Sequence, residues 1–154
     1  MLSKSPLICL ALLAVVGCAR STDTCKQMGA LAQQLRSDAD YLDKATRDDI
    51  KKASGKQRRM EILLSSELRS LKALETISEN IKKQSAKPEL KEALLSVVEE
   101  LIVVRKKQTD SLKKAINDKS FVIADDPSLD ADYVVIDNAS RDFDRKFQAA
   151  CSKD

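Results

Sequence analysis

The stretch that decides the fold is LLSVVEELIVV at residues 94–104, an apolar run interrupted by Ser96, Glu99 and Glu100. Around it, apolar or small uncharged residues recur at alternating four- and three-residue steps, the spacing of one face of an α-helix. These residues are Leu90, Leu94, Val97, Leu101, Val104, Gln108, Ser111 and Ala115, with Ala93, Val98, Ile102, Leu112 and Ile116 widening the seam. The pattern predicts a long helix buried against two neighbouring helices. A membrane span is not expected, because the run is short and carries two carboxylates.

Two further helices are predicted before this one. The first starts near Asp23 or Thr24, either of which is a good N-cap residue, and ends after Thr46. Its apolar face is thin and rich in alanine: Met28, Leu31, Ala32, Leu35, Ala39, Leu42 and Ala45. The second has a broader face, formed by Met60, Leu63, Leu64, Leu68, Leu71, Leu74, Ile77 and Ile81, and ends at Lys82 and Lys83. The polar residues 48–59 between them are interpreted as a solvated loop and helix start, with an anion-binding patch as the alternative.

A fourth helix is predicted from Asp126-Pro127, where the aspartate is a plausible cap and proline suits the first turn. Its apolar stripe is Leu129, Tyr133, Ile136, Ser140, Phe143, Phe147 and Ala150. Phe121-Val122-Ile123, in the preceding connection, is expected to cap the open end of the core or to extend the third helix. Few glycines and prolines (3 of each) and 33% charged residues also favour an all-α fold over a turn-rich β fold.

Short connections make consecutive helices antiparallel neighbours, so the predicted architecture is an antiparallel up-down-up-down four-helix bundle. In that topology the start of the first helix and the end of the fourth lie together. Cys25 and Cys151 occupy these two places. The sequence therefore predicts a Cys25–Cys151 disulfide, the alternative being two unpaired cysteines.

The N-terminal residues have the features of an export signal: Lys4, an apolar run from Leu7 to Val16, and the sequence Val15-Val16-Gly17-Cys18. This last stretch resembles the lipobox of bacterial lipoprotein precursors, although Val16 replaces the more usual Ala or Ser. The resemblance implies a signal peptide over residues 1–17, cleavage before Cys18, and attachment of diacylglyceryl and palmitate-type acyl chains to Cys18. The alternative is an ordinary signal peptide cut nearby. The expected organisation is then a lipidated tether at 18–23 and a bundle domain at 24–154.

Charge and composition exclude several functions. Without Lys4, 26 of the 27 basic residues remain against 24 acidic ones, so a dedicated nucleic-acid binder is not expected. Histidine is absent and there is no glycine-rich phosphate loop, so neither an enzyme nor a metal or nucleotide cofactor is predicted. Lys82, Lys83 and Lys87 should lie at the Cys25/Cys151 end, where they can contact anionic lipid headgroups.

The sequence favours a non-enzymatic structural or interaction role for a lipoprotein anchored to a membrane of the bacterial cell envelope. The domain would lie in the periplasm or on the outer face, and its partner would be another envelope protein or the cell wall. The alternative is a carrier or sensor that binds an apolar ligand in the helical core. Leu95 and Val103 lie off the main seam and are candidates for contact with a partner or a lipid chain.

Overall fold

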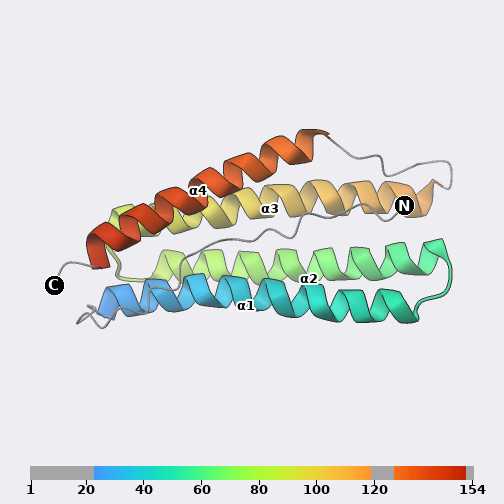
Figure 1. Ribbon diagram of the computed structural model, residues 1–154, viewed down its shortest axis with the longest axis horizontal. Coiled ribbons are helices and arrows are strands. Elements are labelled where there is room, and N and C mark those ends of the chain that lie inside the picture. Colours follow the sequence, from blue (N-terminus) through green and yellow to red (C-terminus); the bar gives the residue numbers. More distant parts are fainter. Residues whose placement is uncertain (1–22, 119–126, 152–154) are drawn as a thin grey trace.

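The computed structural model describes residues 23–118 and 127–151, and these form four long helices lying side by side (Figure 1). They are α1 (Asp23–Lys52), α2 (Lys56–Lys83), α3 (Pro88–Asn117) and α4 (Pro127–Cys151). The described ranges contain no β-strand, so the all-helical prediction is confirmed.

The short connections at 53–55 and 84–87 return the chain alongside the helix that it has just left (Figure 1). At the first of these, Gly55 has a φ of 84° and a ψ of 150°, a conformation that essentially only glycine adopts. At the second, Pro88 occupies the first turn of α3, where its missing N–H leaves no hydrogen bond unmade. Local chemistry thus fixes both chain reversals.

The hydrophobic core is concentrated toward the end of the molecule where α1 starts and α4 ends. It combines the first part of α1, the last part of α2, the first and middle parts of α3 and the middle and last parts of α4. Its largest fully buried side chains are Met28, Ile77, Ile81, Leu90, Leu94, Ile136, Val97, Val98 and Val104. The run at 94–104 therefore lies at the centre of the core, as its apolar seam predicts.

The predicted boundary between the first two helices was wrong. Helix α1 continues past Thr46 to Lys52, and α2 begins at Lys56 instead of Met60. Charge pairs one turn apart, such as Lys51–Asp48 at 3.6 Å, are compatible with a helix through the polar stretch. Lys51 and Lys52 also lie in the last turn of α1, where positive charge suits the helix dipole.

The apolar face of α2 is not uniformly buried. Leu74, Ile77 and Ile81 are buried, but Leu68 is 46% exposed, and the other predicted face residues before Leu74 are only half-buried. The cause is the arrangement of the helices: α2 packs on α1 and α3, whereas α4 packs chiefly on α3 and does not cover α2 within the described residues. The first half of α2 therefore lacks the cover that a fully enclosed bundle would give it.

Where the apolar core thins, a polar contact joins α1 to α2. The buried hydroxyls of Thr46 and Ser66 lie 2.5 Å apart, and Thr46 also donates to the carbonyl of Leu42 at 2.6 Å. Because the Thr46 proton is used in that second bond, Ser66 is the donor to Thr46.

Several predictions fall outside the described residues. These are the lipobox with Cys18, Phe121-Val122-Ile123 and the proposed cap Asp126.

Candidate functional site

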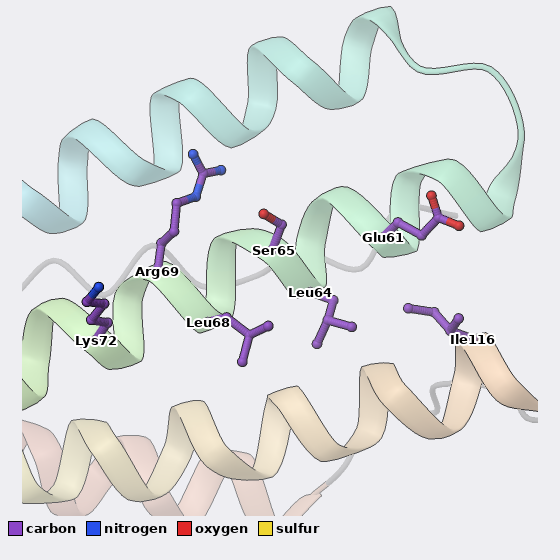
Figure 2. Close-up of a pocket in the computed structure, with 7 residues that line it drawn as sticks. All are labelled: Glu61, Leu64, Ser65, Leu68, Arg69, Lys72 and Ile116. Carbon is purple, nitrogen blue, oxygen red and sulfur yellow. The ribbon is translucent and has the colours of Figure 1, made fainter.

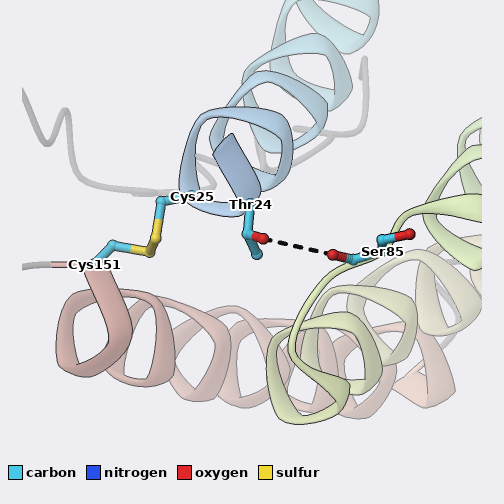
Figure 3. The surroundings of a disulfide bond; sticks show 4 residues. All are labelled: Thr24, Cys25, Ser85 and Cys151. Carbon is cyan, nitrogen blue, oxygen red and sulfur yellow. Dashed lines mark hydrogen bonds between the residues drawn. A yellow bond between two sulfur atoms is a disulfide. The ribbon is translucent and has the colours of Figure 1, made fainter. Parts of the chain in front are cut away.

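The start of α1 and the end of α4 are joined covalently. Cys25 and Cys151 form a disulfide with an S–S distance of 2.00 Å (Figure 3). Their Cα atoms lie 5.8 Å apart, within the roughly 4.4–6.8 Å range that a disulfide allows. The predicted pairing is therefore seen, and it closes a loop with a sequence separation of 126.

The α2–α3 connection lies at the same end of the molecule. The hydroxyl of Thr24 donates to the backbone carbonyl of Ser85 at 3.5 Å, the outer limit of a hydrogen bond (Figure 3). Thr24, predicted as a possible cap, is thus a helical residue whose side chain bridges to another element. This contact brings residues 84–87 beside the first turn of α1.

The three predicted headgroup-binding lysines surround this connection, and all are exposed. Lys82 pairs with Glu79 at 3.0 Å, whereas no ion pair is found for Lys83 or Lys87 within the described part of the chain. A fourth lysine, Lys91, donates to the carbonyl of Gln84 at 3.2 Å and so fixes the connection instead of facing solvent freely. The α2–α3 connection therefore carries Lys83 and Lys87 as exposed cations, without an ion pair among the described residues, next to the start of α1.

The most basic stretch of the sequence lies around the α1–α2 connection, near the opposite end. Here Lys51 pairs with Asp48 at 3.6 Å and Arg58 with Glu61 at 3.2 Å. Arg59 donates to the carbonyl of Ala53 at 3.3 Å. Three of the five basic residues of this stretch are therefore occupied locally, which favours the solvated helix-end interpretation over an anion-binding patch. The five are Lys51, Lys52, Lys56, Arg58 and Arg59.

A polar network that was not predicted from the sequence links α2, α3 and α4. The guanidinium of Arg105 donates to both carboxylate oxygens of Glu67, at 3.0 and 3.1 Å, and to Oε1 of Gln108 at 3.1 Å. Nε2 of Gln108 in turn donates to the Tyr133 hydroxyl at 3.1 Å. Burial raises the pKa of Glu67, and the charge and hydrogen bond of Arg105 partly offset that rise. The network fixes the register of three helices.

A groove of about 490 Å³ runs along the poorly covered half of α2 (Figure 2). Leu64 and Leu68 of α2 and Ile116 of α3 form its apolar floor, and these side chains point into the space between the two helices. Its polar rim consists of Glu61, Ser65, Arg69 and Lys72. The sequence did not predict this groove, because the apolar pattern placed Leu68 in the core. Only the exposure of Leu68 in the structure reveals the groove.

Two further features of the described residues concern metal binding and membrane insertion. Across residues 23–118 and 127–151, no three or more Asp, Glu, Cys or His side chains are grouped so that they could hold a metal ion. In the same ranges, no helix combines the length and the apolar character needed to span a bilayer.

Comparison with known proteins gives no relative: no protein-family profile, curated protein or solved structure matches this chain.

Proposed function

We propose that this protein is a lipoprotein of the bacterial cell envelope, anchored through Cys18, with a non-enzymatic structural or protein-interaction role. In this proposal residues 1–17 are removed, residues 18–23 form the tether, and the remainder forms an antiparallel up-down-up-down bundle. The observation that carries it is the lipobox-like sequence Val15-Val16-Gly17-Cys18 at the end of an apolar run.

The disulfide supports the exported location. Disulfides persist in oxidising compartments such as the bacterial periplasm and are rare in the cytosol. The Cys25–Cys151 bond joins the two ends of the described chain, beside the proposed tether. The joined ends and the chain reversals at 53–55 and 84–87 also support the antiparallel topology.

The proposal includes an orientation. Five or six tether residues reach at most about 20 Å, which would hold the start of α1 close to the bilayer. The α2–α3 connection would then face the headgroups, because Thr24 contacts Ser85. Lys83 and Lys87, which are exposed and lack a described ion pair, would add about 1 kcal/mol each at an anionic surface. Lys82 would add less, because it already pairs with Glu79.

The partner-binding role is based on the surface of the bundle that would not face the membrane in this orientation. The ends of α1 and α3 and the start of α2 would point away from the membrane, and the exposed Tyr41 and Val103 lie along the sides. Such a bundle can present a rigid surface to another envelope protein or to the cell wall without any catalytic group.

The test of the anchor is Cys18→Ser, with Cys9→Ser as the matched control. Cys9 lies within the segment that would be removed, so its substitution should leave the mature protein unchanged. We expect Cys18→Ser to move the protein from the membrane to the soluble fraction, because multiple acyl chains give stable anchoring and no helix among the described residues can span a bilayer. Mass spectrometry of the wild-type N-terminal peptide should show an acylated Cys18. An unmodified N-terminus at another residue would exclude the proposal.

The alternative of an apolar-ligand carrier is favoured by one observation, the groove beside Leu64, Leu68 and Ile116. This groove lies at the surface between α2 and α3, whereas the sequence-based alternative placed a ligand in the core.

A further inference from the structure

The groove along α2 has an apolar floor that is open to solvent. Leu68 is 46% exposed, and Leu64 and Ile116 beside it are only half-buried. Three large aliphatic side chains on neighbouring helices thus share a surface depression of about 490 Å³, within the size range of small-molecule sites. Covering this floor with an apolar group would remove the exposed surface from water, which is favourable.

The charges along the rim are not symmetric. Arg69 and Lys72 are exposed and have no ion pair within the described part of the chain. The acidic rim residue Glu61 is instead engaged by Arg58 at 3.2 Å and Gln57 at 3.4 Å. The end of the groove at Arg69 and Lys72 is therefore electropositive, while the end at Glu61 and Ile116 carries no free cation among its lining residues.

The length of the groove sets the size of its occupant. Glu61 and Lys72 are eleven residues apart on one helix, or about 16 Å at roughly 1.5 Å per residue. An extended chain advances about 1.2 Å per bond, so an alkyl chain of about a dozen carbons covers this distance.

We infer that the α2 groove binds a single-chain anionic amphiphile, with its alkyl chain over Leu64, Leu68 and Ile116 and its head group against Arg69 and Lys72. Its carboxylate or phosphate would accept charge-assisted hydrogen bonds from these two cations. The reverse orientation would place the anionic head group beside Glu61. A cationic amphiphile would meet Arg69 and Lys72 with like charge. This ligand site is independent of membrane anchoring through Cys18.

The experiment uses the full chain carrying Cys18→Ser, with its Cys25–Cys151 disulfide oxidised, so that no attached lipid competes for the groove. Isothermal titration calorimetry is performed with dodecanoate and with dodecyl phosphate, both below their micelle concentrations. Dodecyltrimethylammonium serves as the cationic probe with the same chain length. We expect 1:1 saturable binding of at least one anion, and the one that binds distinguishes a carboxylate from a phosphate ligand.

Two variants test the location of the site. Arg69→Gln combined with Lys72→Gln should weaken anion binding about tenfold, because it removes both cations that would pair with the head group. The matched control, Lys44→Gln with Lys106→Gln, removes two exposed lysines elsewhere and should have no effect. Leu68→Gln should weaken binding at least as much, whereas Val103→Gln, at a similarly exposed valine on α3, should not.

Circular dichroism of each variant verifies that the helices are retained. Three outcomes would overturn the inference: no saturable binding of either anion, equal affinity for dodecyltrimethylammonium, or anion binding that both groove variants leave unchanged.

Discussion

The Cys25–Cys151 bond should make a large single contribution to the free energy of unfolding. The perturbation is the double substitution Cys25→Ala and Cys151→Ala, which removes the bond without leaving a buried hydroxyl. Cys25 is only 5% exposed, so alanine is preferable to serine at this position. The bond closes a loop with a sequence separation of 126. Chain entropy then gives a loss of about 5 kcal/mol in the free energy of unfolding.

The assay is urea unfolding followed by circular dichroism at 25 °C, comparing the oxidised protein with the double variant. With a urea dependence of about 1.5 kcal/mol per molar, the midpoint should fall by about 3 M. The wild-type protein reduced with a thiol provides the control and should unfold near the midpoint of the double variant. A loss below about 1 kcal/mol would refute the reasoning, because it would mean that the unfolded chain gains little freedom when its ends are released.

Three further predictions concern the core, the α1–α2 connection and the polar network. Leu94→Ala should lower the free energy of unfolding, measured with urea, by about 3–5 kcal/mol because Leu94 is fully buried. Leu68→Ala, at a half-exposed position, should lower it by less than about 1.5 kcal/mol. Equal losses would contradict the described core. Gly55→Ala should lower the free energy of unfolding by about 1–3 kcal/mol through backbone strain alone, since nothing lies within 4 Å of the added methyl group. The melting temperature should fall, and an unchanged value would contradict the positive φ of Gly55. Burial raises the pKa of Glu67, so the folded state holds this proton more tightly than the unfolded state, and stability falls as pH rises from about 4.3 through the folded pKa. Glu67→Gln should lack this decline, so its stability relative to wild type should improve between pH 3.5 and pH 7 in urea unfolding; a constant difference would contradict the pKa shift.

The third helix shows what apolar periodicity can predict. The steps through Leu90, Leu94, Val97, Leu101 and Val104 identify one face, and all five side chains are buried. A helix buried on several sides leaves this strong pattern because most of its neighbours are apolar. The disulfide was predictable for a different reason: topology alone places the two chain ends together.

The uneven cover of α2 was not predictable from the same kind of pattern. Leu68 and Leu74 follow one apolar stripe, yet Leu74 is 5% and Leu68 46% exposed. The difference depends on where the neighbouring helices lie, which periodicity along one helix does not encode. The Glu67–Arg105 pair has the same origin, because a charge on each of two helices meets its partner only at one register. The end of α1 was misplaced because a polar helix leaves no apolar pattern to follow.

The disulfide also determines how a mechanical load would cross the molecule. In a molecule held at residue 18 and pulled at the opposite end of the bundle, where α1 ends and α4 starts, the force enters through the first turn of α1. Without the Cys25–Cys151 bond, all of that force would travel along α1, whose main packing partner is α2, and could peel it away. With the bond, the force divides at Cys25 and also enters α4 at Cys151. Two helices then share the load along their axes, so many contacts must shear at once instead of parting one turn at a time.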